Sequence, residues 1–188
     1  MPHKELPLES LADIPSLPRG SHISFVQKSS VCFDNQGFSR GLVLLVECKG
    51  MHKESQDDFV ENFFRITWKD PVDDVLRLSY ADREESVEDS AKAIGMLLIT
   101  NLTKYKMGRQ SPRGTHIDYF LVDINAELPF QSPDVACVEF TGIISGLDKI
   151  KHRMKVKRDR LADKRDFPTY IVCVEHSYPV AQIERVEP

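Results

Sequence analysis

The chain has 188 residues, of which 41% are hydrophobic and 29% are charged. That composition is typical of a globular protein with a buried core, and it excludes disorder over most of the chain. At roughly 150 residues per domain, this length favours a single domain. The net charge of −4 gives no indication of a surface dedicated as a whole to binding a polyanion.

Membrane and secretion signals are not evident in the sequence. Uninterrupted apolar runs such as residues 41–46 are far shorter than the roughly 20 residues that span a bilayer. The first ten residues lack a basic stretch followed by an apolar one, so no secretory signal is predicted and a cytoplasmic location is expected. Four widely spaced cysteines are expected to be free buried thiols rather than zinc ligands or disulfides: Cys32, Cys48, Cys137 and Cys173.

The charge is distributed unevenly along the chain. Residues 54–89 hold twelve acidic and four basic side chains, a net of −8. Residues 147–166 hold nine basic and four acidic side chains, a net of +5. A helix this basic in an acidic protein indicates either a face that binds phosphates or a solvated face that pairs with the acidic segment.

The N-terminal part of the chain predicts an arm followed by strands. Residues 1–21 contain four prolines, which favour an irregular N-terminal arm. Residues 22–188 are expected to form one α/β domain, in which residues 22–84 supply N-terminal antiparallel strands. Four segments of this part have a strand-like composition: 23–33, 41–49, 63–69 and 75–79.

The clearest helix is predicted from about residue 87 to residue 105. Ser86 is a suitable N-cap, and Glu88 and Asp89 lie in the first turn, where acidic side chains favour the positive end of the helix dipole. Apolar side chains then recur at intervals of three and four residues, which indicates one buried face. The predicted elements after this helix are strands 106–109, 116–122 and 135–144, a basic helix 147–164, and strands 169–175 and 180–186.

From residue 85 onward this gives a helix, three strands, a helix and a strand. The αβββαβ order resembles the core of the restriction-endonuclease-like superfamily, the PD-(D/E)xK nucleases, over residues 85–188. The resemblance implies a mixed central sheet, with an Asp on the second strand and a Glu on the third that bind Mg²⁺ or Mn²⁺. A Lys two residues after the Glu helps to orient the attacking water in that superfamily. Asp118 and Glu139 occupy the two acidic positions here.

The two acidic residues lie in apolar surroundings, where an unpaired carboxylate is costly. Mg²⁺ prefers carboxylate oxygens and keeps several waters for a phosphate and a nucleophile, so a metal site is one explanation for them. The other explanation is structural. Glu139 then pairs with a base such as Arg113 or Lys155, and Asp118 caps a turn.

The lysine position of the superfamily is occupied by Thr141, which cannot supply a positive charge. Some members of the superfamily carry a site residue on a neighbouring helix, and Lys155 and Lys157 of the basic helix are the candidates here, with Lys155 preferred. Glu88 matches the position of an additional acidic ligand in many members. Its alternative role is to favour the helix dipole.

Three short segments also resemble a family of uncharacterised bacterial proteins. They are residues 113–121, 138–143 and 168–176, and the likeness extends over most of the chain. This resemblance implies a bacterial source and supports the fold, but it implies no reaction.

A second set of residues fits the nuclease spacing. Asp34, followed by Glu47 and Lys49, even retains the lysine. The proline-interrupted sequence before it predicts no amphipathic first helix, and the segment after it is acidic and would repel a phosphate backbone. We therefore interpret residues 41–49 as a plain strand.

The sequence thus predicts a Mg²⁺-dependent nuclease or phosphodiesterase. Asp118 and Glu139 would be metal ligands, Glu88 a third ligand, and Lys155 the partner of the water or phosphate. Residues 147–166 would face nucleic acid. The alternative is a catalytically inactive nuclease-like domain that serves as a binding or scaffold module.

The sequence leaves the oligomeric state open, with a homodimer as one option. His116 is interpreted as a core or rim histidine on the same strand face as Asp118.

Overall fold

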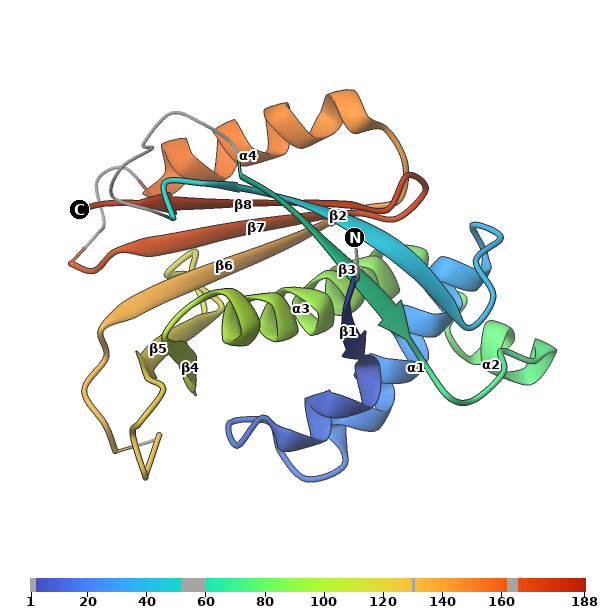
Figure 1. Cartoon of the computed structure of the whole chain (residues 1–188), viewed down its shortest axis with the longest axis horizontal. Coiled ribbons are helices and arrows are strands. Elements are labelled where there is room, and N and C mark those ends of the chain that lie inside the picture. The colour runs from blue at the N-terminus through green and yellow to red at the C-terminus, as the bar shows by residue number, and fades with distance from the viewer. Residues whose placement is uncertain (1–2, 52–59, 130, 162–165) are drawn as a thin grey trace.

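The computed structural model describes residues 3–51, 60–129, 131–161 and 166–188. It is an α/β fold built on one mixed sheet of eight strands, in the order β1-β3-β2-β8-β7-β6-β5-β4 (Figure 1). The strands are β1 (Lys4–Pro7), β2 (Gly41–Lys49), β3 (Val60–Thr67), β4 (Tyr105–Gln110), β5 (Tyr119–Asp123), β6 (Ala136–Ile143), β7 (Thr169–Glu175) and β8 (Val180–Val186).

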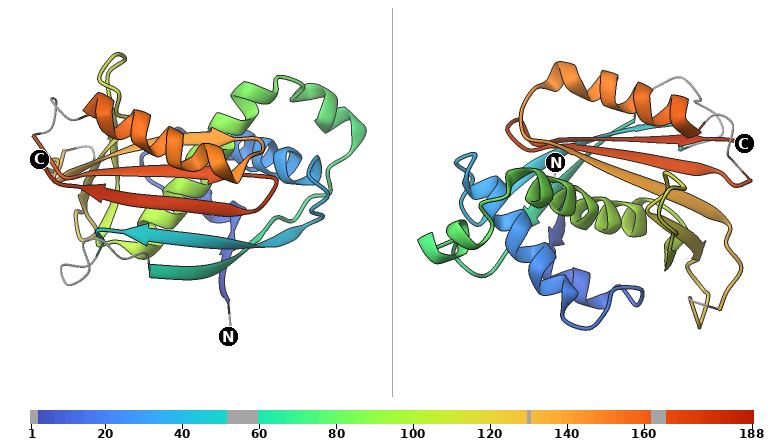
Figure 2. Two further views of the ribbon diagram at one scale, coloured as in Figure 1. Left: turned by 90° about the horizontal axis from the view of Figure 1, so that it is seen from above. Right: turned by 180° about the vertical axis from the view of Figure 1, so that it is seen from behind.

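Helices cover both faces of this sheet. They are α1 (Ser21–Asp34), α2 (Asp74–Ser79), α3 (Arg83–Leu102) and α4 (Leu147–Leu161), and a 3-10 helix, η1, covers Leu8–Asp13. Helices α1 and α3 lie together on one face, and α4 lies alone on the other (Figures 1 and 2). The expected α/β class with a mixed sheet is therefore confirmed. No helix among the described residues is long and apolar enough to cross a membrane.

The C-terminal half follows its predicted order. Strands β4, β5 and β6 form an antiparallel meander, α4 makes the crossover to β7, and β6 and β7 are parallel. The first helix starts earlier than expected, because Asp82 rather than Ser86 is its N-cap and accepts hydrogen bonds from the backbone N–H groups of Glu84 and Glu85. The strand β8 then joins this half to β2 and β3.

The N-terminal half differs from the prediction in three places. Residues 1–21 are not wholly irregular, because β1 pairs in parallel with β3 and η1 buries Leu8 and Leu11. Residues 23–33 form helix α1 instead of a strand. Residues 75–79 belong to helix α2, whose N-cap Asp73 accepts a hydrogen bond from the backbone N–H of Leu76. The antiparallel pairing of β2 with β3 is as expected.

Helix α3 lies unusually close to the sheet. A Cβ atom at Gly95 would meet the ring of Phe140 at 2.3 Å, and one at Gly142 would meet the carbonyl oxygen of Val87 at 2.4 Å. Only glycine leaves room for these approaches. They bring the first turns of α3 against the C-terminal half of β6, which matters for the site described below.

All four cysteines are buried free thiols, as predicted. Burial raises the pKa of Cys32, Cys137 and Cys173 to about 12 in each case. These thiols are therefore protonated at neutral pH and behave as small apolar side chains.

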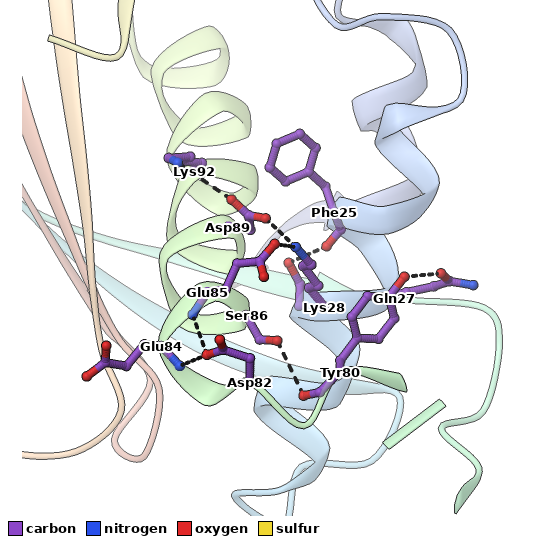
Figure 3. Close-up of polar contacts among 11 residues, drawn as sticks. Phe25, Gln27, Lys28, Tyr80, Asp82, Glu84, Glu85, Ser86, Asp89 and Lys92 are labelled. Atoms are coloured by element: carbon purple, nitrogen blue, oxygen red, sulfur yellow. Dashed lines mark hydrogen bonds and ion pairs between the residues drawn. The ribbon is translucent and has the colours of Figure 1, made fainter. Parts of the chain in front are cut away.

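A buried cation joins α1 to α3. The Nζ atom of Lys28 lies 2.6 Å from a carboxylate oxygen of Glu85 and 2.6 Å from one of Asp89, as Figure 3 shows. Its side chain is only 9% exposed. Nearby, the Tyr80 hydroxyl donates a hydrogen bond to Gln27. Because a long charged side chain is rarely buried unless it is paired, this cluster fixes how the two helices pack.

Replacing Lys28 with methionine is expected to lower the free energy of unfolding by about 2–3 kcal/mol, because Asp89 keeps a largely buried charge without its main partner. The matched control is Lys92→Met, which removes a second cation 3.5 Å from Asp89 whose side chain is 30% exposed. That change should cost no more than about 1 kcal/mol. Urea denaturation of both variants measures the difference, and equal midpoints would contradict this role of Lys28.

Candidate active site

The candidate site lies where the pairing between β5 and β6 ends. Strand β5 pairs only with the first residues of β6, as far as the pair Tyr119↔Val138. On its other side β6 stays paired with β7 along its length. Beyond Val138, one edge of β6 has therefore lost its β5 partner. The backbone N–H of Phe140 on this edge donates a 2.7 Å hydrogen bond to Oδ2 of Asp118.

A second carboxylate meets the same edge two residues further along. Glu88, in the first turns of α3, faces the backbone of Gly142, which opposes the rise that burial causes in the pKa of this carboxyl. The close approach of Val87 to Gly142 is what brings Glu88 there. Two carboxylates thus occupy alternate positions along the open edge, where N–H groups without a strand partner need acceptors.

Glu139 directly precedes Phe140 on β6, and its side chain faces α4. Its side chain is 9% exposed and forms an ion pair with Nζ of Lys157. Burial and the neighbouring charge of Asp118 raise the pKa of Glu139 to about 7, although Lys157 acts in the opposite direction. The pKa of Glu88 is also raised, chiefly by burial, while Lys157 is the strongest of the cations that oppose the shift. The three carboxylates and Lys157 therefore form one electrostatic group.

Asp118 and Glu139 share an open cavity of about 280 Å³. The loop between β4 and β5 forms the rest of its wall, including Arg113 and His116. Glu88 lines a separate hollow of about 640 Å³ with Lys149 and Arg153. Within the described ranges, no group of three or more His, Cys, Asp or Glu side chains is arranged to hold a metal ion. The structure thus brings together two of the predicted ligands and places the third beside them.

The preferred lysine is not at this site. Lys155 is exposed on α4, whereas Lys157 contacts Glu139. The reason is helical periodicity, because Lys157 follows the buried Met154 by three residues and precedes the buried Leu161 by four. These spacings place Lys157 on the side of α4 that faces the sheet, and they are the sequence signal that distinguishes it from Lys155.

Thr141 follows Glu139 on the same face of β6. It is fully buried, and its hydroxyl has no hydrogen-bond partner in the described structure. The positive charge in contact with Glu139 comes from Lys157 of α4. The structural explanation in which Glu139 pairs with Arg113 or Lys155 is therefore replaced by the Glu139–Lys157 pair.

The basic side chains of α4 lie near acidic side chains of the sheet and near acidic side chains of residues 54–89. Lys157 pairs with Glu139 and Arg158 with Glu184, both on the sheet. Lys149 and Arg153 share a hollow with Glu84, Glu85 and Glu88 of the acidic segment. The part of that segment at residues 52–59 lies outside the described residues. Lys151, Lys155 and Arg160 are exposed, so α4 keeps a basic outer face.

The second set of residues is held in other contacts. Asp34, at the end of α1, forms a 2.6 Å ion pair with Arg77, and Glu47 accepts a hydrogen bond from Gln182. Lys49 ends β2, which is the plain strand that was predicted. The expectation that no helix precedes this strand is wrong, because α1 does. His116 is exposed and has φ 60°, so it lies in a left-handed turn before β5 rather than on the face of a strand.

The site offers two converging carboxylate groups, a lysine in contact with one of them, and an open cavity beside both. Such a set can hold a divalent cation through oxygen ligands and place a cation against an anionic substrate. Comparison of the chain with family models, with curated proteins and with solved structures found no match.

Proposed function

We propose that this protein is a Mg²⁺-dependent phosphodiesterase of the restriction-endonuclease-like type that acts on nucleic acid. The observation that carries the proposal is the placement of Asp118 and Glu139 in one cavity at the parting of β5 and β6, with Lys157 against Glu139. The connectivity supports it as well, because α3, the β4-β5-β6 meander, α4 and β7 occur in the αβββαβ order.

The donor set suits Mg²⁺, or Mn²⁺ in its place. Mg²⁺ is usually bound through one or two carboxylates, with waters and substrate phosphates completing the octahedron. Asp118 and Glu139 would supply the two carboxylates, and Glu88 would act on the same cation from the neighbouring position. When bound, the ion polarises a phosphoryl oxygen and lowers the pKa of a bound water.

The protein groups have distinct roles in this proposal. The N–H of Phe140 fixes Oδ2 of Asp118, and Oδ1 of the same carboxylate would be the oxygen that binds a ligand. Lys157 donates to Glu139 in the described state, and its remaining ammonium protons can donate to a substrate phosphate or to the attacking water. The basic outer face of α4 would attract the nucleic-acid backbone.

Calorimetric titration with Mn²⁺ and Mg²⁺ tests the metal site without a choice of substrate. The wild type should bind with a Kd between about 1 μM and 1 mM. Asp118→Asn and Glu139→Gln should abolish the binding heat while remaining folded, because each removes a carboxylate ligand. Glu47→Gln, a carboxylate on β2 outside the site, should titrate like the wild type. Binding that survives both site substitutions would overturn the assignment.

A second function is favoured by Thr141 and by the separate hollow of Glu88. In this alternative the domain has lost catalysis and serves as a nucleic-acid binding or scaffold module. A binding and cleavage experiment distinguishes the two functions. Affinity for nucleic acid without cleavage in Mg²⁺ or Mn²⁺ would identify the module, whereas cleavage that depends on Glu139 would identify the enzyme.

A further inference from the structure

An apolar pocket lies beside the carboxylate cavity. This second pocket has a volume of about 240 Å³ and is lined by Thr115, Ile117, Phe120, Cys137, Asp166, Phe167 and Thr169. Ile117 also lines the cavity of Asp118 and Glu139, so the two spaces adjoin. The volume is below the roughly 300–1,000 Å³ of a pocket for a drug-sized ligand, and it suits a single ring system.

The strand register places the pocket at a defined step from the carboxylates. Phe120 is paired with Cys137 across β5 and β6, and each is two residues from an acidic residue, Asp118 and Glu139 respectively. Residues two apart on a strand share a face and are separated by about 7 Å. The pocket therefore lies one strand step from the carboxylates, on the same face of the sheet. That step is comparable to the reach from a phosphate to a base within one nucleotide.

Two aromatic rings form a corner in this pocket. The rings of Phe120 and Phe167 are nearly perpendicular, at 84°, with their centroids 6.4 Å apart. The guanidinium of Arg109 lies 4.0 Å from the Phe120 centroid and is itself paired with Asp134, which holds the ring in place. A flat ring that stacks on one phenylalanine in this corner meets the edge of the other, an arrangement that aromatic pairs favour.

We propose that this pocket binds one nucleobase of a single-stranded nucleic acid whose phosphate lies at Asp118 and Glu139. The inference rests on the proposed function and adds a substrate class to it. The exposed carboxylate of Asp166 at the pocket can accept a hydrogen bond from an N–H group of a base, such as the imide N–H of thymine. A base enters such a pocket only when it has left its stack, so single strands bind in preference to duplex.

Fluorescence anisotropy with labelled oligonucleotides tests this inference. The probes are an oligothymidylate of about 12 nucleotides, within the range that single-strand binding modules cover, an abasic strand of the same length, and a duplex of the same length. Ca²⁺ is present as an oxygen-seeking cation, and a denaturing gel checks that the probes stay intact. The wild type should bind the oligothymidylate about tenfold more tightly than the abasic strand or the duplex.

Phe120→Leu and Phe167→Leu keep an apolar side chain but remove the ring. Each should weaken oligothymidylate binding about tenfold and leave abasic binding unchanged. The control is Phe63→Leu, which alters a 42% exposed ring on β3, outside both pockets, and should change neither affinity. The abasic comparison uses the wild type, so it remains decisive if a variant fails to fold.

The outcomes separate the two proposals. Equal affinity of the wild type for oligothymidylate and abasic strand would overturn the base pocket and leave the phosphodiesterase standing. Absence of binding to every probe would overturn both. Selective loss of oligothymidylate affinity in the two pocket variants supports the base pocket, whether or not the bound strand is cleaved in Mg²⁺.

Discussion

Replacing Lys157 with alanine is expected to reduce cleavage of a single-stranded substrate by about 100- to 1,000-fold, the effect of removing one preorganised electrostatic group from an active site. Lys157 is the cation in contact with Glu139, so its loss removes the positive charge that α4 places against this carboxylate. The measurement is the single-turnover rate with a labelled strand in Mn²⁺. Lys157→Arg, which retains the charge, should recover part of the rate because the guanidinium differs in shape.

Lys155→Ala is the matched control for this prediction. It removes the same type of side chain from the same helix, two residues away, but Lys155 is exposed and lies about 200° around the helix from Lys157. Its cleavage rate should stay within about threefold of the wild-type rate. At most, the salt dependence of nucleic-acid binding should fall by the amount expected for one missing phosphate contact. An equal loss of rate in both variants would indicate general electrostatic attraction rather than a specific role for Lys157.

The C-terminal half could be predicted because its sequence patterns agree with its tertiary environment. Helix α3 has apolar residues at helical spacing, and strands β6 and β7 are buried along their whole length, as their apolar sequences indicated. Even so, the start of α3 was placed four residues late. Asp82 and Ser86 are both good N-caps, and only the observed hydrogen bonds to Asp82 distinguish them.

The segment 23–33 was mistaken for a strand because it is rich in β-branched and aromatic side chains, which favour strands on average. In the structure it is a helix that packs against α3, where Lys28 meets Glu85 and Asp89. That ion pair joins residues about sixty positions apart, so the sequence around Lys28 gives no sign of it. Tertiary contacts here override local propensity.

The candidate site was also predictable from the sequence only in part. Asp118 and Glu139 could be identified because carboxylates within apolar strands require a partner. The aromatic pocket could not be predicted, because Phe120 lies on β5 and Phe167 lies in the loop before β7. The two rings meet only through the register of the sheet. The choice between Lys155 and Lys157 depended on the phase of α4, which the buried Met154 and Leu161 determine.

Replacing Gly142 with alanine is expected to lower the free energy of unfolding by about 3 kcal/mol, at the upper end of the usual cost of overpacking. The new Cβ would lie 2.4 Å from the carbonyl oxygen of Val87 and 2.6 Å from its Cγ1 atom. Because a backbone oxygen cannot swing aside as a side-chain tip does, α3 would have to move away from β6. Urea denaturation measures the loss, with circular dichroism to confirm that the variant folds.

Gly41→Ala is the control, since a Cβ atom there meets the carbonyl oxygen of Ile66 at 3.3 Å and should cost no more than about 1 kcal/mol. Unchanged stability of Gly142→Ala would contradict the close packing of α3. Val87 is adjacent to Glu88, so the displacement that relieves the clash also withdraws Glu88 from the open edge of β6. Gly142→Ala should therefore lose stability and Mn²⁺ affinity together, whereas Glu88→Gln should lose only affinity. That difference would show that the glycine contact is what holds the third carboxylate at the site.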